Sequence, residues 1–204
     1  MIMVGLTQRI MPPNRFGERY DALDPRWHEF LAACGVIGVP LVNIPERAVA
    51  VARSLNLAGV LLTGGEDLAR YGGCSPLRDE TERALLRWAG SHGRTVLGVC
   101  RGMQLILDAH GTELVPVEGH VAVEHPALID GEPHRINCYH RWAARDVGAP
   151  LVATGLAGRV VEAVRHPDQP IHGVMWHPER RAATDPHRDR DVAMVARLFA
   201  GNAR

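Results

Sequence analysis

The first half of the chain alternates short apolar runs with amphipathic segments, and no other feature constrains the fold as strongly. The apolar runs are bounded by glycine or proline, and several amphipathic segments close on glycine or asparagine. In chain order the segments are 2–8, 25–35, 39–44, 46–56, 58–65, 78–93, 95–100 and 101–111. Consecutive β-α units of a parallel sheet have this pattern. The sequence therefore predicts an α/β fold with an open, mostly parallel sheet flanked by helices.

The pattern changes after Gly111 to shorter strand-like runs. These runs are 112–117, 120–129, 134–140, 159–166 and 170–177, and a final helix is expected over 188–201. Asp130 and Gly131 predict a hairpin turn between two of the runs, so we expect a small antiparallel addition to the sheet. A chain of 204 residues can bury a full core, and we expect one domain over residues 1–204.

Charge and apolar patterning exclude several classes of partner. The chain has 23 Lys and Arg against 23 Asp and Glu, so no overall field attracts nucleic acid or a membrane surface. No stretch approaches the ~18 apolar residues of a spanning helix, and the apolar N-terminal run lacks a basic leader. We expect a soluble, cytoplasmic protein. The cysteines Cys34, Cys74, Cys100 and Cys138 are irregularly spaced, which predicts free thiols.

Cys100 is the centre of the segment G-V-C-R-G, Gly98 to Gly102. A sharp strand-to-helix turn leaves no room for a Cβ atom two positions to either side of an exposed nucleophile, so glycine flanks it there. Backbone N–H groups at the start of the following helix favour a thiolate and can hold an oxyanion. This pattern by itself leaves a buried core cysteine open as the alternative.

His177 and Glu179 stand two residues apart around Pro178, which biases His177 toward an extended backbone. Both side chains can then point to the same side. A cysteine nucleophile needs an imidazole as its base, and the imidazole needs a carboxylate on its other nitrogen. A His-x-Glu pair without a nucleophile more often consists of two solvent-exposed residues without a catalytic role. Here Cys100 completes the set.

Gly64 and Gly65 end an apolar run in the segment LLTGGEDL. A tight loop at this position lets a backbone N–H approach a ligand and supply a second donor to an acyl oxyanion. The glycine pair alone is a weak signal, because such pairs mostly just end strands.

With these segments, the sequence resembles the class I glutamine amidotransferase superfamily, and within it the branch of γ-glutamyl hydrolases, peptidase family C26. The matching motifs are LTGGEDL with the following YGG, RDETE, GVCRGMQ, INCYH, VVEAVRHP and GVMWHPE, which cover about residues 58 to 180 in the family's order. The resemblance implies a three-layer, flavodoxin-like α/β fold. It also implies cleavage of a γ-glutamyl amide to glutamate and an amine, without metal or cofactor.

The resemblance assigns roles to individual residues. It implies that Cys100 is the nucleophile, His177 the base and Glu179 its orienter. The oxyanion would be held by the backbone at Gly65 and Arg101. Residues that match the γ-glutamyl pocket are Gly64, Gln104, Asn137, Cys138, Tyr139 and His140.

The motifs say less about the leaving group. The chain is shorter than γ-aminobutyrate-type enzymes and lacks their usual proline after the glycine pair. Its short length and the segments RFGERYDALDPRW, NCYHRWA and MWHPER look most like those of the γ-glutamyl-CDP-amidate hydrolases, which serve bacterial surface-polysaccharide decoration by releasing cytidine diphosphoramidate. The alternatives are a γ-glutamyl-γ-aminobutyrate-type hydrolase, a glutaminase subunit that delivers ammonia to a synthase, and an inactive ligand-binding module.

Two further groups of residues affect the choice of ligand. Residues 9–25 form a long irregular stretch, expected to open near Cys100, and the arginines Arg9, Arg15, Arg19 and Arg26 could bind a phosphate there. A solvated loop is the alternative. The histidines His120, His125, His134 and His140 favour core or solvated positions over metal ligation. We therefore expect a small γ-glutamyl amide as the partner, and leave a homodimer open.

Overall fold

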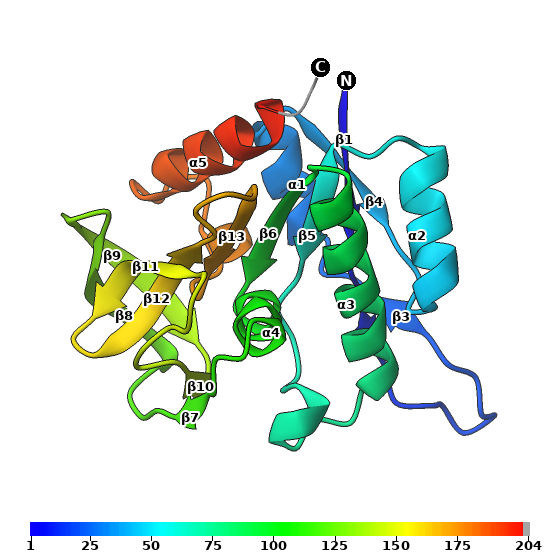
Figure 1. The fold of residues 1–204 in the computed structure, drawn as a ribbon, viewed down its shortest axis with the longest axis horizontal. Coiled ribbons are helices and arrows are strands. Elements are labelled where there is room, and N and C mark those ends of the chain that lie inside the picture. Colours follow the sequence, from blue (N-terminus) through cyan, green and yellow to red (C-terminus); the bar gives the residue numbers. More distant parts are fainter. Residues whose placement is uncertain (202–204) are drawn as a thin grey trace.

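The computed structural model describes residues 1–201, through which runs a nine-stranded sheet (Figure 1). The strand order is β4 (Val36–Pro40), β1 (Ile2–Leu6), β5 (Gly59–Leu62), β6 (Thr95–Val99), β13 (Ile171–Val174), β12 (Val160–Arg165), β11 (Val152–Ala157), β8 (Val121–Ile129) and β9 (Glu132–Tyr139). The strands from β4 to β13 pair in parallel. The remaining strands continue the same sheet antiparallel. The predicted α/β class is confirmed.

Helices cover both faces of the parallel part (Figure 1). One face carries α1 (Arg26–Ala33) and α5 (Arg188–Ala200), and the other carries α2 (Pro45–Ser54), α3 (Pro76–Ser91) and α4 (Arg101–Ala109). The central strand β5 shows why: Val60 and Leu62 pack into the core on the α3 side, whereas Leu61 packs into the core on the α1 side. Side chains alternate along a strand, so a strand that is apolar throughout needs cover on both faces.

Local sequence signals fix several element boundaries. Pro45 and Pro76 begin α2 and α3, where the missing N–H costs nothing because the first helical donors have no intrahelical partner. Asp130 and Gly131 both have positive φ, +51° and +85°, and form the predicted hairpin turn between β8 and β9.

Other predictions hold only in part. Most of residues 9–25 are irregular as expected, but β2 (Arg9–Ile10) and β3 (Asp21–Ala22) pair as an antiparallel hairpin at the base of this stretch. The Asn14 side chain closes its tip by accepting the backbone N–H groups of Phe16 and Glu18. The expected strand over 39–44 instead lies at β4, where it pairs in parallel with β1.

The remaining elements are short or were not expected. These are β7 (Val115–Pro116), which pairs with β10 (Trp142–Ala143), and two single turns, η1 (Ala69–Tyr71) and η2 (Pro178–Arg180). Strand β11 was missed, because Gly155 interrupts its apolar run and its pairing with β12 contains register shifts. Among residues 1–201, no helix combines the length and apolar character that crossing a membrane requires.

Candidate active site

Cys100 occupies a sharp turn between the end of β6 and the start of α4. Its φ and ψ are +52° and −105°, a backbone conformation that costs about 1–3 kcal/mol for a residue with a side chain. The turn is held by hydrogen bonds from the Cys100 N–H to the Val174 carbonyl, at 2.8 Å, and from the Gln104 N–H to the Cys100 carbonyl, at 3.0 Å. The strand-to-helix elbow that the sequence predicts is therefore present.

The two flanking glycines have the steric role expected of them. A Cβ on Gly98 would lie 2.5 Å from the carbonyl carbon of Gly102, and a Cβ on Gly102 would lie 2.1 Å from the Leu62 carbonyl oxygen. Real Cβ atoms essentially never come this close to backbone atoms. Glycine at these positions lets α4 start directly against β5 and β6, with Cys100 at the carboxyl edge of the sheet.

His177 and Glu179 follow β13, the strand next to β6. The imidazole Nδ1–H donates to Glu179 Oε1 at 2.7 Å, and both residues are buried. This bond leaves Nε2 as the ring nitrogen for a substrate or nucleophile. The ring also lies edge-on to Tyr139, with centroids 5.5 Å apart.

Asn137 on β9 clamps the backbone of His177. Its Oδ1 accepts the His177 N–H and its Nδ2 donates to the His177 carbonyl, each at 2.9 Å. The family resemblance implies a pocket role for Asn137, and in the structure its side-chain amide contacts the backbone of the base. The Tyr139 ring also makes a cation–π contact, because the Arg180 guanidinium lies 4.3 Å from the ring centroid.

The electrostatics join Cys100, His177 and Glu179. Burial alone lowers the pKa of His177, but the negative charges of Cys100 and Glu179, with hydrogen bonds to both, outweigh it and raise that pKa to about 9. The imidazole therefore stays protonated at neutral pH when the cysteine is a thiolate. An imidazolium beside a thiolate is the arrangement that cysteine acyl transfer uses.

This charge arrangement predicts the pH dependence of activity. The imidazolium must supply a proton to the leaving amine, so kcat/KM is expected to fall as pH rises through about 9. In Glu179→Gln one stabilising negative charge is gone, and the alkaline limb should move to lower pH. A pH profile of kcat/KM for both proteins checks this. A limb that stays in place in Glu179→Gln would contradict the coupling.

Gly64, the first residue of the glycine pair, packs against the Cε1 atom of the His177 imidazole. A Cβ on Gly64 would come within 2.5 Å of His177 Cε1, so only glycine lets the loop pack flat against the ring. Gly65 also lines a cleft of about 410 Å³ together with Cys100. The loop that was expected to supply an oxyanion donor is thus brought to the nucleophile.

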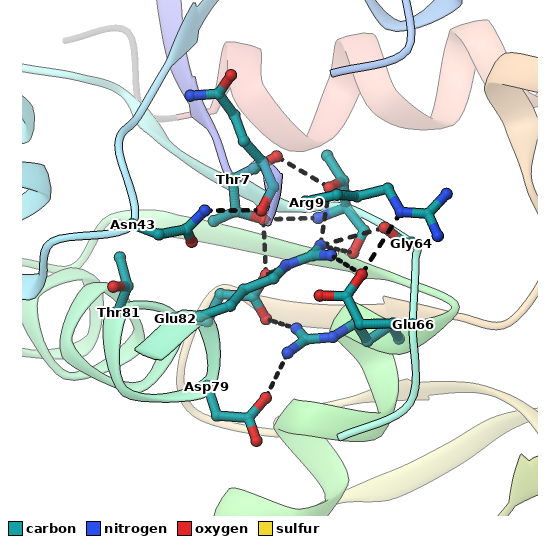
Figure 2. Close-up of polar contacts among 12 residues, drawn as sticks. Thr7, Arg9, Asn43, Gly64, Glu66, Asp79, Thr81 and Glu82 are labelled. Carbon is teal, nitrogen blue, oxygen red and sulfur yellow. Dashed lines mark hydrogen bonds and ion pairs between the residues drawn. The ribbon is translucent and has the colours of Figure 1, made fainter. Parts of the chain in front are cut away.

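A buried ion-pair network holds this loop (Figure 2). Glu66 and Glu82 lie on either side of one guanidinium, that of Arg78, at 3.0 and 2.9 Å. The same guanidinium donates to the carbonyls of Thr63 and Gly64, at 2.8 and 3.1 Å. Arg78 therefore fixes the peptide planes that precede Gly65.

The network continues to the elbow and the first strand. The Arg101 guanidinium, buried beneath the elbow, pairs with Glu82 and Asp79. Thr7 at the end of β1 donates to Glu82 at 2.8 Å. Sequence reasoning missed this network. Its signal was the R-D-E-T-E pattern at 78–82, which puts an Arg and a Glu four residues apart on one helix face.

Some of the expected substrate-binding residues line the cleft beside Cys100, whereas Cys138 is buried in the protein interior. The cleft beside Cys100 is lined by Gln104, Tyr139 and His140, among others. The Gln104 amide donates to the Trp142 carbonyl at 2.9 Å. Cys138 is fully buried, with its thiol 3.6 Å from Glu162.

The four arginines that were expected to bind phosphate lie in different surroundings. Arg9 lies beside Gly65 and 3.4 Å from Glu66 (Figure 2). It also lines a small hollow together with His177. Arg15 lies over the ring of Phe16 near the hairpin tip, and Arg19 is exposed. Arg26 begins α1 and pairs with Asp24 at 2.6 Å.

Comparison with known proteins identifies the family of this chain. Residues 28–190 match the family model of class I glutamine amidotransferases. A γ-glutamyl-CDP-amidate hydrolase of Campylobacter jejuni is 29% identical over 183 residues, covering 88% of this chain and 90% of that protein. A glutamine-hydrolysing GMP synthase subunit of Methanopyrus kandleri is 27% identical over 154 residues, covering 70% of this chain and 78% of that protein.

A solved structure shares the fold. The crystal structure of a Thermoplasma acidophilum protein described as a GMP synthase subunit superposes with a TM-score of 0.71 at 16% identity, covering 99% of this chain and 94% of that one. The family model spans most of the sheet, the elbow and the His177 segment. The chain therefore belongs to the class I glutamine amidotransferase family.

Proposed function

We propose that this chain hydrolyses a γ-glutamyl amide through a thioester on Cys100. The observation that carries the proposal is the buried His177–Glu179 pair, bonded at 2.7 Å, whose imidazole is charge-coupled to the cysteine at the elbow. A nucleophile, a base and an orienter in this arrangement perform acyl transfer on many folds.

The reaction has two steps. The Cys100 thiolate attacks the γ-carbonyl carbon, and the oxyanion that forms faces the backbone N–H groups of Gly65 and Arg101. As the C–N bond breaks, His177 gives its proton to the leaving amine, and a glutamyl thioester remains. The neutral imidazole then takes a proton from water, whose oxygen attacks the thioester. Glutamate leaves, and the thiolate and imidazolium are restored.

We propose γ-glutamyl-CDP-amidate as the substrate, with glutamate and cytidine diphosphoramidate as products. Support comes from the Campylobacter jejuni hydrolase of that name, which matches this chain over nearly the whole length of both. The arginine-bearing hairpin gives a physical reason. It begins at Arg9, beside Gly65, and carries Arg15 and Arg19 outward, where guanidinium groups can bind a diphosphate.

Substrate selectivity tests the leaving group. A charge-assisted contact is worth about 1.5–3 kcal/mol, so Arg15→Ala and Arg19→Ala should each lower kcat/KM about 10- to 100-fold for γ-glutamyl-CDP-amidate. Both variants should leave the hydrolysis of glutamine and γ-glutamyl-γ-aminobutyrate unchanged, since those leaving groups carry no phosphate. Steady-state kinetics on the three amides measures this, and Arg47→Ala on the exposed surface of α2 is the matched control.

Two results would reject the phosphate-binding role. One is a wild-type protein that prefers either of the two substrates whose leaving group carries no phosphate. The other is a pair of variants that slow all three substrates alike.

A glutaminase subunit that passes ammonia to a synthase is the second candidate, favoured by the similarity to the GMP synthase subunit of Methanopyrus kandleri. It predicts weak hydrolysis of glutamine alone, and strong stimulation when a synthase is added. Efficient turnover of γ-glutamyl-CDP-amidate by the purified chain would exclude it.

A further inference from the structure

Four potential ligands converge between the antiparallel strands, next to the β9 residues that contact His177. They are His120, His125, Cys138 and Glu162, and their ligating atoms all lie within 4.8 Å of one another. His125 lies on β8, Cys138 on β9 and Glu162 on β12, and His120 directly precedes β8. Residues 42 positions apart in sequence thus meet at one point, although the sequence spacing gave no ligand pair.

The spacing of these atoms is close to the spacing of ligands around a tetrahedral metal ion. His120 Nδ1 lies 3.0 Å from Glu162 Oε1, and His125 Nε2 lies 3.6 Å from the same oxygen. The Cys138 Sγ atom lies 3.1 Å from His125 Nε2 and 3.6 Å from Glu162 Oε2. Bonds of 2.0–2.3 Å to zinc place tetrahedral ligand atoms about 3.3–3.8 Å apart.

Hydrogen bonds account for only part of the cluster, because Cys138 Sγ bonds with His125 Nε2 and with Glu162 Oε2 while two other ligand atoms have no partner. Glu162 and Cys138 are completely buried, and the side chains of His120 and His125 are only 11% and 18% exposed. Among the described residues, His120 Nδ1 and Glu162 Oε1 have no hydrogen-bond partner despite their 3.0 Å separation, because their relative orientation is not that of a hydrogen bond. Buried polar atoms without partners are rare and destabilising, and a shared cation would satisfy both.

The charges also favour a cation. Glu162 is a completely buried carboxyl group, and a coordinating thiol loses its proton, so two of the four ligands would be anionic around the ion.

We propose that His120 Nδ1, His125 Nε2, Cys138 Sγ and a Glu162 carboxylate oxygen bind one zinc ion. Mixed nitrogen, sulfur and carboxylate donors in a tetrahedral set suit zinc. Binding breaks the Cys138 S–H bond, forms the zinc–sulfur bond and releases the proton to solvent. His140 Nε2, 3.5 Å from Glu162 Oε2, orients the carboxylate without binding the ion itself.

The proposed ion would be structural, because protein atoms fill all four positions. It ties β8, β9 and β12 together at Cys138. The neighbours of Cys138 are Asn137, which clamps the His177 backbone, and Tyr139, whose ring lies against the His177 imidazole. The site would therefore hold β9 in the position that the catalytic base needs.

Metal titration of the purified, chelator-treated chain tests the proposal. Adding Co²⁺ should produce a thiolate-to-cobalt charge-transfer band with intense tetrahedral d–d absorption, saturating at about one ion per chain, and Zn²⁺ should displace it. Zn²⁺ should also raise Tm, because an ion that binds only the folded state stabilises it. Elemental analysis gives the metal content before chelation.

Matched variants locate the site. The charge-transfer band should disappear in Cys138→Ser and persist in Cys34→Ser, another buried cysteine, and in Cys100→Ala, which removes the catalytic thiol. His125→Gln should weaken Zn²⁺ binding, whereas His134→Gln on the same hairpin should not. His125→Gln retains the thiol and so decides the matter if Cys138→Ser loses its near-ultraviolet circular dichroism.

The proposal would be overturned by wild-type protein without the cobalt band. It would also be overturned if the band survives in Cys138→Ser or disappears in Cys100→Ala, because either result puts the metal elsewhere.

Discussion

Replacing Cys100 by alanine is expected to abolish glutamate release, with kcat reduced by a factor of about 10⁴ or more while the fold is retained. The thioester cannot form without the thiolate, and neither His177 nor Glu179 can replace it as nucleophile. The fold should be retained because alanine is smaller than the buried Cys100 side chain. The turn itself is held by backbone hydrogen bonds, which the substitution does not remove. Kinetics and circular dichroism of the same preparation measure activity and fold together.

The other cysteines provide the controls. Burial raises the pKa of Cys34 to about 12, so its thiol stays protonated and unreactive at neutral pH. Cys74 is exposed at the rim of the cleft. Cys34→Ala and Cys74→Ala should both keep most of the activity. Equal loss in either variant would point to damage of the fold, and substantial activity in Cys100→Ala would exclude a cysteine mechanism at the elbow.

Glu82→Gln is expected to have the largest effect on stability, about 3–5 kcal/mol of unfolding free energy. Glu82 is completely buried and its carboxylate pairs with Arg78 and with Arg101. The glutamine is isosteric but neutral, so it leaves two buried guanidinium groups with reduced compensation. Because Arg78 also holds the Gly64 carbonyl, we expect kcat to fall in the protein that still folds.

Chemical denaturation of Glu82→Gln and Glu80→Gln checks this prediction. Glu80 is exposed on the same helix, and its replacement should change the unfolding free energy by no more than about 0.5 kcal/mol. Similar effects from the two substitutions would show that the buried network does not carry the stability assigned to it.

The sequence predicts most of the parallel half of the fold, because several boundaries there have a local cause; the bounds of β4 are the exception. Gly98 and Gly102 mark the elbow since no Cβ fits at either position, and Pro45 and Pro76 begin helices where they are tolerated. The antiparallel half has fewer such signals. Strand β11 contains Gly155 and register shifts, so its pairing depends on the neighbouring strands rather than on its own residues.

Local contacts of the candidate site could likewise be predicted from the sequence, and contacts between distant segments could not. His177 and Glu179 are two residues apart, so their bond could be predicted from spacing, as could the turn at Cys100. Asn137 reaches His177 across 40 positions, and Glu162 meets Cys138 across 24, because strand order in the sheet decides which side chains face one another.

Mass spectrometry of an acid-quenched reaction tests the central claim most directly. Wild-type protein mixed with γ-glutamyl-CDP-amidate, or with glutamine, and quenched before the first turnover is complete should carry one glutamyl group on the peptide that contains Cys100. The adduct should disappear after longer incubation as water releases glutamate, and Cys100→Ala should never acquire it. Turnover without an adduct on Cys100, or an adduct on Cys34, Cys74 or Cys138 instead, would contradict the account.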